Sequence, residues 1–443
     1  MTRQVTGISD ALTAAQRYIA ALPAGDGLWL AEQRQAAVER LFDLGLPHAR
    51  QEAWRYSEVQ HLLDQGFTTA DADSAAPVVE IEKHFLPEPV AARLVFVDGL
   101  FQADYSSVDS EAAQIDSLRQ AMAKADKPVL QALGSLSGAG DHGFAALNLA
   151  TMQDGAVIRL GAGIRLERPI ELLHLSTGAA SGRSLRPRHL IMLEEGAAAS
   201  LVERHLTLDA ESDYFNNLVC EIRLGTGASL SHQRVQLEGS QAFHLSDIYL
   251  ELQADAHYRG VNAILGGAWS RTNLTNRFAG QGAKCELDGL YLAGGEQLVD
   301  VHLDVDHAVP GCESRENFKG ILGGRGKAVF DGRILVQEQA QQSSAHLSNG
   351  NLMLSRQAEI DTKPQLEILA DDVQCSHGTT VGQLEPQAMF YLRSRGLSEE
   401  QARRLLCLGF AQEILDRFET DSLREQLSEV IRRRIETADT ALV

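Results

Sequence analysis

From about residue 145 to residue 385 the chain repeats one pattern: a strand-like run, a turn of small residues and a second strand-like run. An alanine follows each turn, and the steps between these alanines are 29, 28, 27, 45 and 30 residues, at Ala199, Ala228, Ala256, Ala283, Ala328 and Ala358. This period predicts a solenoid in which each turn buries its face on the next, with an insertion before Ala328. Because no long helix interrupts the strands, a β-helix is favoured, with a stacked β-sandwich as the alternative.

Residues 1–140, which precede this core, are predicted to be mostly helical. Apolar residues recur at helical spacing, and glycine or proline ends each run. The predicted elements are, in order, a helix capped by Ser9 that ends at Leu22, a helix over 29–44, a polar linker at 69–76, a hairpin over 93–101 that turns at Asp98-Gly99, and helix over 108–134.

Residues 386–443, which follow the core at 141–385, are also predicted to be helical. A short helix at 387–395 ends at Gly396, and Ser398 with Gln401 forms a capping box for the next helix. That helix carries an apolar residue every four positions, and a third helix is predicted over 422–437; the apolar residues are Ala402, Leu406, Phe410, Ile414 and Phe418. The tail either packs on the end of the solenoid as a cap or docks a partner.

Composition and charge exclude several classes of function. The net charge is -20, which argues against nucleic-acid binding because a phosphate backbone requires a cationic face. We identify no secretory signal at the N-terminus and no apolar run of about 18 residues, so the chain is expected to be cytoplasmic without a membrane span. The glycine-rich run at 320–328 lacks the spacing of a phosphate loop, and no hydrolase signature is present.

The five cysteines are scattered and form no CxxC pair, so a self-contained cysteine metal site is not expected. Cys220, Cys285, Cys312 and Cys407 are interpreted as small core residues, and Cys407 is placed away from the main apolar stripe of its helix.

Cys375 and His377 form the clearest candidate for chemistry. If their segment is extended, both side chains point to the same face, which would make half of a site for a soft or borderline metal. The other ligands would have to come from elsewhere in the fold or from another chain. The alternatives are a buried cysteine beside a turn histidine, or a cysteine nucleophile activated by His377.

Several longer segments together carry a resemblance to a known family. They are EAWRYS at 52–57, FAALNLATMQDGAVIRL at 144–160, VDHAVPGCESRENFKGILGGRGKAVFDGRI at 305–334, AEIDTKPQLEILADDVQCSHGTTVGQL at 358–384 and MFYLRSRGLSEEQARRLLCLGFAQEIL at 389–415. These segments resemble the SufB/SufD family of iron–sulfur cluster assembly proteins. The resemblance implies a mainly β fold, with a right-handed parallel β-helix between N-terminal and C-terminal helical regions. It also implies a non-catalytic scaffold of the SUF system.

The resemblance further implies partners and site residues. The chain would pair with SufB and bind the ATPase SufC, and His377 would help hold a transient iron–sulfur cluster at the interface with SufB, with Cys375 beside it. No cluster would be bound tightly by this chain alone, and a homodimer is possible in isolation. The residues implied in SufC binding are Phe390, Tyr391, Leu392, Arg393, Arg395, Leu406 and Phe410.

Two other functions are weighed against the scaffold. A β-helix enzyme acting on polysaccharide would be expected to show paired carboxylates, and no such pair stands out. The chain could instead be SufB itself, but SufB has a functional cysteine where this sequence has Asn349 and a carboxylate near the position of His377. Both differences favour the SufD branch of the family.

Overall fold

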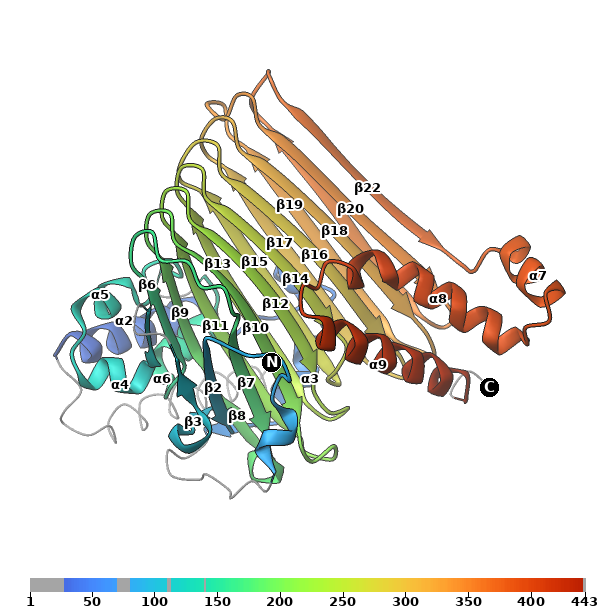
Figure 1. The fold of residues 1–443 in the computed structure, drawn as a ribbon, viewed down its shortest axis with the longest axis horizontal. Coiled ribbons are helices and arrows are strands. Elements are labelled where there is room, and N and C mark those ends of the chain that lie inside the picture. Colours follow the sequence, from blue (N-terminus) through green and yellow to red (C-terminus); the bar gives the residue numbers. More distant parts are fainter. Residues whose placement is uncertain (1–27, 70–79, 110–112, 139–140, 441–443) are drawn as a thin grey trace.

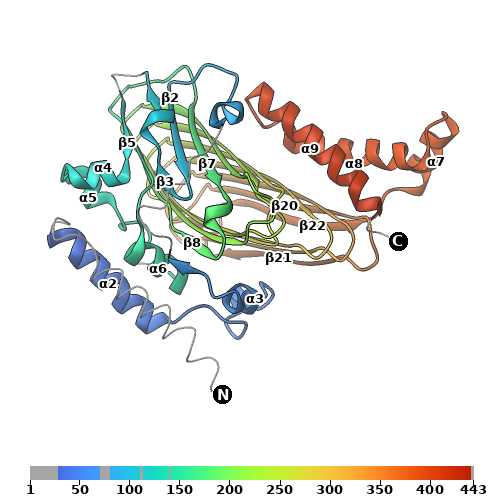
Figure 2. The same ribbon diagram turned by 90° about the horizontal axis from the view of Figure 1, so that it is seen from below.

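The computed structural model describes residues 28–69, 80–109, 113–138 and 141–440, and their centre is a parallel β-solenoid (Figure 1). About eight turns lie between residues 157 and 382, and each turn adds one strand to each of two facing sheets. Helices lie before and after the solenoid (Figure 2). The predicted mainly β fold, a parallel β-helix flanked by helical regions, is confirmed, and the β-sandwich alternative is wrong.

Successive strands of the solenoid alternate between the two sheets, and within each sheet they pair in parallel. The first sheet, called sheet A, contains β5 Ala113–Ser117, β6 Ala156–Leu160, β9 Arg188–Leu193, β11 Tyr214–Leu224, β13 Phe243–Leu252, β15 Trp269–Phe278, β17 Leu298–His307, β19 Lys327–Val336 and β21 Glu359–Ile368, with the short strands β1 Thr68–Thr69 and β8 Arg183–Leu185 beside them.

The facing sheet, called sheet B, contains β3 Leu100–Phe101, β2 Ala92–Val97, β7 Ile170–Ser176, β10 Ala198–Thr207, β12 Ser229–Leu237, β14 His257–Ile264, β16 Lys284–Ala293, β18 Glu313–Leu322, β20 Ser344–Met353 and β22 Gln374–Gly382, with β4 Ser107–Val108 paired to β2. The strands of the two sheets enclose a lumen that side chains fill. Strands β21 and β22 are the last of their sheets.

The hydrogen-bonded register corrects the predicted repeat. Ala228, Ala256 and Ala283 do occupy equivalent positions, one residue before their strands of sheet B. The next equivalent positions are Cys312 and Ser343, so the steps remain between 27 and 31 residues. The predicted insertion before Ala328 is wrong, because Ala328 lies in β19 and Ala358 directly precedes β21, and both of these strands belong to sheet A. Ala199 lies two residues past the equivalent Ala197. The repeat was misread where Cys312 and Ser343, rather than alanine, precede the strand.

The elements before the solenoid agree with prediction except in one segment. The helix α2 Leu28–Leu44 and the hairpin of β2 and β3 are confirmed, and Asp98 and Gly99 take the positive φ values, 50° and 81°, that a tight turn requires. The predicted helix over 108–134 is wrong at its start, because β5 pairs with β6 before α4 Leu118–Ala123 and α5 Lys127–Ala132 begin. The alternate burial of β5 is a period of two that the helical interpretation overlooked.

The predicted helix from Ser9 to Leu22 lies outside the described residues, as does most of the predicted linker at 69–76. The remaining short elements are η1 Glu52–Trp54, α3 Val59–Asp64, η2 Ile81–His84, η3 Ala103–Tyr105, α6 Gly143–Thr151 and η4 Gly178–Ala180.

The two groups of helices cover opposite outer faces of the solenoid (Figure 2). On the N-terminal side, α2, α3 and α6 pack against outward-facing residues of sheet A, including Val157, Leu190 and Trp269. On the C-terminal side, α8 Glu399–Leu415 and α9 Asp421–Thr440 pack against outward-facing residues of sheet B. The tail therefore covers a lateral face of the solenoid. Of the two predicted alternatives, the cap on the end is wrong, and the docking of a partner stays a prediction.

The C-terminal helices were predicted well in extent and less well in orientation. The helices α7 Pro386–Ser394, α8 and α9 and the Ser398 capping box are confirmed. Cys407 is fully buried in the apolar cluster with Ala411, Ile414 and Phe418, so its interpretation as a small core residue is confirmed, whereas its placement away from the apolar face is wrong. The predicted stripe used steps of four residues, and each such step turns about 40° too far around a helix of 3.6 residues per turn. The true face mixes steps of three and four.

A buried carboxyl group in the lumen gives a first testable prediction. Glu316 of β18 lies in register between Leu287 and Leu347, and no described residue donates a hydrogen bond to its oxygens. Burial raises the pKa of Glu316 from its ordinary 4.5 to about 8, and the nearby Ser314 offsets this only in part. The folded protein thus holds a proton that the unfolded chain releases, so the free energy of unfolding should fall between pH 4.5 and 8. The slope from this group is at most about 1.4 kcal/mol per pH unit.

The substitution Glu316→Gln should flatten that slope and raise the free energy of unfolding at pH 8, since the amide carries no charge at any pH. Urea unfolding at several pH values measures both effects. Glu313→Gln is the matched control, because Glu313 lies on the same strand with its side chain exposed beside Lys284. An unchanged slope in Glu316→Gln, relative to the unsubstituted protein, would contradict the assignment.

Candidate functional site

The last turn of the solenoid is open. Strands β21 and β22 end their sheets, and most of their residues are exposed or half-buried although earlier strands are largely buried. Large apolar side chains are exposed there, namely Ile368, Leu369 and Val381. A strand edge with unpaired backbone groups is a template for another strand, so this end of the molecule can pair with a second chain.

Cys375 and His377 lie on this open turn, at the outermost strand of the solenoid in Figure 1. They are two residues apart on β22, and their neighbours in register on β20 are the lumen-facing Ala345 and Leu347. Both side chains therefore project from the lumen side of the sheet. Cys375 is half-buried and His377 is exposed. The prediction that Cys375 and His377 point to the same face is therefore confirmed. No further turn of the described residues follows β22, so both side chains can be reached from outside.

Burial raises the pKa of the Cys375 thiol, and a hydrogen bond from the backbone of Ala345 offsets this in part. The thiol is therefore protonated at neutral pH, and a metal would have to displace that proton. With one sulfur and one imidazole, the open turn offers half of a coordination set.

Asn349 lies on β20, the strand next to β22, where its side chain is buried and hydrogen-bonded at both its nitrogen and its oxygen. Its amide donates to the Tyr291 hydroxyl at 3.0 Å, and its oxygen accepts from Asn351 at 2.7 Å and from Thr362 at 3.1 Å. The Thr362 hydroxyl also meets Thr379 of β22 at 3.1 Å. These bonds join the floor of the open turn to its two edge strands, so Asn349 has a structural part here.

The helix α7 carries the most exposed aromatic residues of the C-terminal region. Figures 1 and 2 show it projecting beyond the sheets, and the exposed fractions of Phe390 and Tyr391 are 76% and 57%. The Arg395 guanidinium lies 5.2 Å from the centre of the Tyr391 ring. Arg393 pairs with Glu399 at 3.4 Å across the turn into α8. The result is an exposed surface of aromatic and arginine side chains, the types that concentrate binding energy at interfaces.

The other predicted docking residues lie deeper. Leu392 and Leu406 are half-buried. Phe410 packs toward the solenoid: the Lys319 ammonium lies 4.7 Å from its ring centre and donates to its carbonyl oxygen at 3.2 Å. The predicted set therefore separates into solvent-facing residues on α7 and a residue, Phe410, that fixes α8 to β18.

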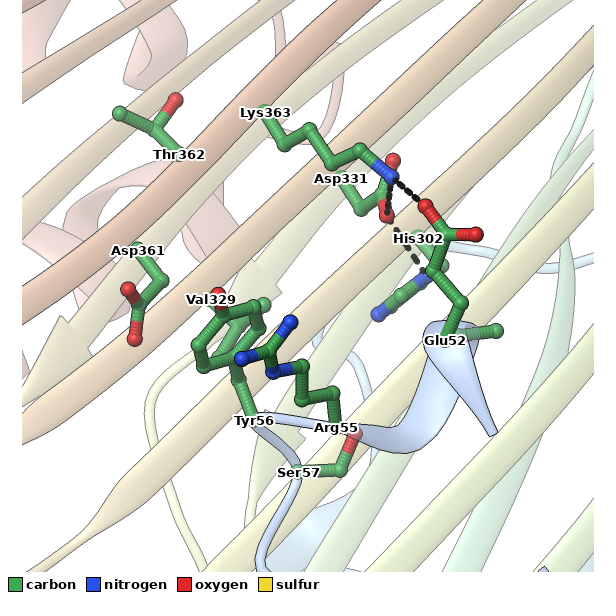
Figure 3. A pocket seen from close by; sticks show the side chains of 11 residues that line it. Glu52, Arg55, Tyr56, Ser57, His302, Val329, Asp331, Asp361, Thr362 and Lys363 are labelled. Carbon is green, nitrogen blue, oxygen red and sulfur yellow. Dashed lines mark hydrogen bonds and ion pairs between the residues drawn. The ribbon is translucent and has the colours of Figure 1, made fainter. Parts of the chain in front are cut away.

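A third feature was not singled out from the sequence as a site. The segment around η1 crosses the outer face of sheet A and lines a pocket of about 290 Å³ (Figure 3). Glu52 accepts from Lys363 of β21 at 2.6 Å, and Lys363 also lies 3.9 Å from Asp331. The hydrogen bond and charge of Lys363 lower the pKa of Glu52.

Trp54 and Ser57 fix the same segment to earlier turns. The Arg271 guanidinium lies 3.8 Å from the centre of the Trp54 ring, and both Arg271 and Ser57 contact the Asp300 carboxylate. The segment thus holds the turns formed by β15 to β21 together through packing contacts and hydrogen bonds. Charged residues at outward positions of the strands, such as Lys363 and Asp331, could have indicated this contact from the sequence.

Comparison with known proteins identifies the family. Residues 175–410 match the family model described as the SUF system FeS cluster assembly, SufBD core domain, and residues 16–172 match the SufBD protein N-terminal region. The chain is 34% identical to an iron–sulfur cluster assembly SufBD family protein of Synechocystis, over 91% of this chain and 90% of that protein. It is 29% identical to the iron–sulfur cluster assembly protein SufD of Escherichia coli, over 93% and 94% of the two chains.

A chloroplastic relative is also similar, the protein ABCI7 of Arabidopsis thaliana, with 32% identity over 64% of this chain and 61% of that protein. Among the helices of the described residues, none has the length and apolar character needed to cross a membrane. The two family models together span the helices before the solenoid, the solenoid itself and the start of α8. The chain therefore belongs to the SufBD family of iron–sulfur cluster assembly proteins of the SUF system.

Proposed function

We propose that this chain is a non-catalytic scaffold subunit of the SUF complex, which pairs with SufB through its open turn and binds the ATPase SufC through α7. The observation that carries the proposal is the coincidence of two features on one strand. The unpaired edge of β22 is where a second chain can add, and Cys375 and His377 are on that same strand. A cluster held there would be shared between the two chains.

The ligand chemistry supports a transient cluster. A thiolate and an imidazole are both ligands of iron–sulfur centres, and His377 is the more accessible of the two. Two ligands are too few to hold a cluster tightly, so release to a recipient remains possible. The proposed partner supplies the rest. In isolation, the same open edge would favour a homodimer.

The compartment proposed is the cytoplasm. All five cysteines lie in the described part of the chain and none forms a disulfide, which suits a reducing environment. The net charge of -20 favours protein partners over nucleic acid. Family membership favours the scaffold over the polysaccharide enzyme, and the match to a relative named SufD supports the SufD branch over SufB.

The cluster proposal predicts the result of His377→Ala. The variant, co-expressed with SufB and SufC, should assemble the complex at normal yield, since an exposed side chain contributes little to folding. After anaerobic reconstitution it should lose most of its visible absorption and most of its iron and sulfide. Both are measured per complex.

His346→Ala is the matched control for this experiment. His346 is exposed on the neighbouring strand β20, but it points to the opposite face, where its Nδ1 lies 2.8 Å from the Ser376 hydroxyl. It should leave the iron and sulfide content unchanged. A full complement of iron and sulfide in His377→Ala would show that His377 is structural and would remove the ligand role from the proposal.

A further inference from the structure

The lumen is polar in the turns formed by β10 to β13, far along the solenoid from the open turn. Three buried side chains converge there: His205 of β10, Glu238 just after β12, and His244 of β13. One ligand atom from each lies within 4.8 Å of those of the other two. The exposed fraction of each residue is 3% or less. The site lies inside the protein, away from Cys375 and His377.

The outer nitrogen of each imidazole has a hydrogen-bond partner, and the inner nitrogen of each faces the centre of the group. His205 Nε2 lies 2.7 Å from the Glu203 carboxylate, which also binds Arg234. His244 Nε2 lies 2.6 Å from the Ser246 hydroxyl, which accepts from Arg234 as well. In the tautomer that carries the proton on Nε2, Nδ1 has the lone pair that a metal would need. Outer hydrogen bonds of this kind orient histidines that bind metals.

The contact between His244 and Glu238 is the closest in the group. His244 Nδ1 lies 2.7 Å from the Glu238 carboxylate. A lone pair on Nδ1 would be repelled at this distance, so the contact holds either a proton on Nδ1 or a cation bound between the two groups.

Asn216 of β11 completes the group. Its amide nitrogen is placed 3.2 Å from His205 Nδ1 and 3.3 Å from His244 Nδ1, while no described residue donates a hydrogen bond to its buried Oδ1. The two ends of an amide have the same shape, and a half-turn would direct Oδ1 to the inner nitrogens. Separations of about 3 Å are those of neighbouring ligands around an ion bound at 2.0–2.2 Å. A cavity of about 10 Å³ beside the group is lined by His205 and His244, but not by Glu238 or Asn216, and has room for one water.

We propose that His205, His244 and Glu238, with the Asn216 amide oxygen, form a buried site for one divalent first-row transition metal ion. Two imidazoles, a carboxylate and an amide oxygen form a borderline ligand set that suits Fe²⁺ or Zn²⁺. Because all four side chains are buried, the ion would join the two sheets from inside and act as a structural element of the solenoid. The proposal is independent of the cluster site at the open turn.

The test uses the full chain with Cys375→Ser and His377→Ala, so that the open turn cannot contribute ligands. The protein is produced in defined medium supplemented with iron, zinc or Co²⁺ as a visible probe. We expect about one equivalent of metal per chain by elemental analysis, and a Co²⁺ ligand-field spectrum. The iron and zinc preparations distinguish the two native ions. Glu238→Gln, which keeps the shape and removes the charge, should weaken binding at least about 100-fold in competition with a chelator.

Two further variants keep the test decisive. Ser246→Ala removes the outer hydrogen bonds to His244 and Arg234 but leaves all four proposed ligands in place, and it should weaken binding about 10-fold even if Glu238→Gln does not fold. His307→Gln is the matched control, because His307 is also buried in the lumen but bonds to Ser314 at 3.0 Å. Its metal content should match the parent. Metal-free protein from all three media, or equal metal content in the parent, Glu238→Gln and Ser246→Ala, would overturn the proposal.

Discussion

The double substitution Phe390→Ala and Tyr391→Ala should weaken binding of the ATPase SufC by about 100- to 1,000-fold. Both rings are exposed on α7, where they contribute little to the stability of this chain and are available to a partner. Truncating two aromatic anchors of an interface commonly removes about 3–4 kcal/mol of binding free energy. Titration calorimetry of the purified chain with SufC measures the change, and the unfolding midpoint should stay the same.

Phe42→Ala provides the control for that loss. Phe42 is 72% exposed on α2, on the opposite side of the solenoid, so its removal alters exposed aromatic area without touching α7. It should bind SufC normally. Wild-type affinity in the Phe390 and Tyr391 double variant would show that α7 is not the docking surface.

Deletion of residues 386–443 is a weaker test of the same idea. The sequence predicts that the β-helix would still fold without them. In the structure, α8 and α9 bury apolar residues of sheet B, including Val235, Leu290 and Ile321. Removing the helices would expose that face, so a loss of binding could reflect aggregation. The substitutions on α7 avoid this.

The substitution Glu221→Ala should lower the free energy of unfolding by about 3–5 kcal/mol, because it leaves Arg188 buried without its partner. Glu221 of β11 and Arg188 of β9 are both fully buried, and their charged groups are 2.6 Å apart. Glu221 also accepts from the backbone amides of Gly134 and Leu136, and Arg188 contacts Asn148 of α6. One carboxylate thus joins the solenoid to the N-terminal helices.

Glu194→Ala is the appropriate comparison for the ion pair. Glu194 pairs with Arg159 at 2.7 Å, but its side chain is 42% exposed. Its loss should change the free energy of unfolding by less than about 1 kcal/mol. Urea denaturation measures both variants. Equal small effects would mean that the N-terminal helices are held chiefly by apolar packing.

Most of the fold could be predicted from local sequence patterns. The alternation of side chains, the small-residue turns and the capping box at Ser398 are set within a few residues, and each is present in the structure as predicted. Cys375 and His377 could be assigned to one face for the same reason, since strand alternation is a local rule. The helix predicted at 108–134 is wrong at its start, because the alternation of β5 is short and its partner strand, β6, lies about 40 residues further along the chain.

The sequence by itself determined a solenoid of strands with helices at both ends, because turn chemistry and hydrophobic period act over short distances. Only the tertiary structure decided the register, in which Cys312 and Ser343 occupy the positions equivalent to Ala283 in the following turns. It also brought His205, Asn216, Glu238 and His244 together, since residues on successive turns meet only when the strands stack. It placed α8 and α9 on a lateral face of the solenoid, because the apolar residues they cover are spread over strands far apart in the chain.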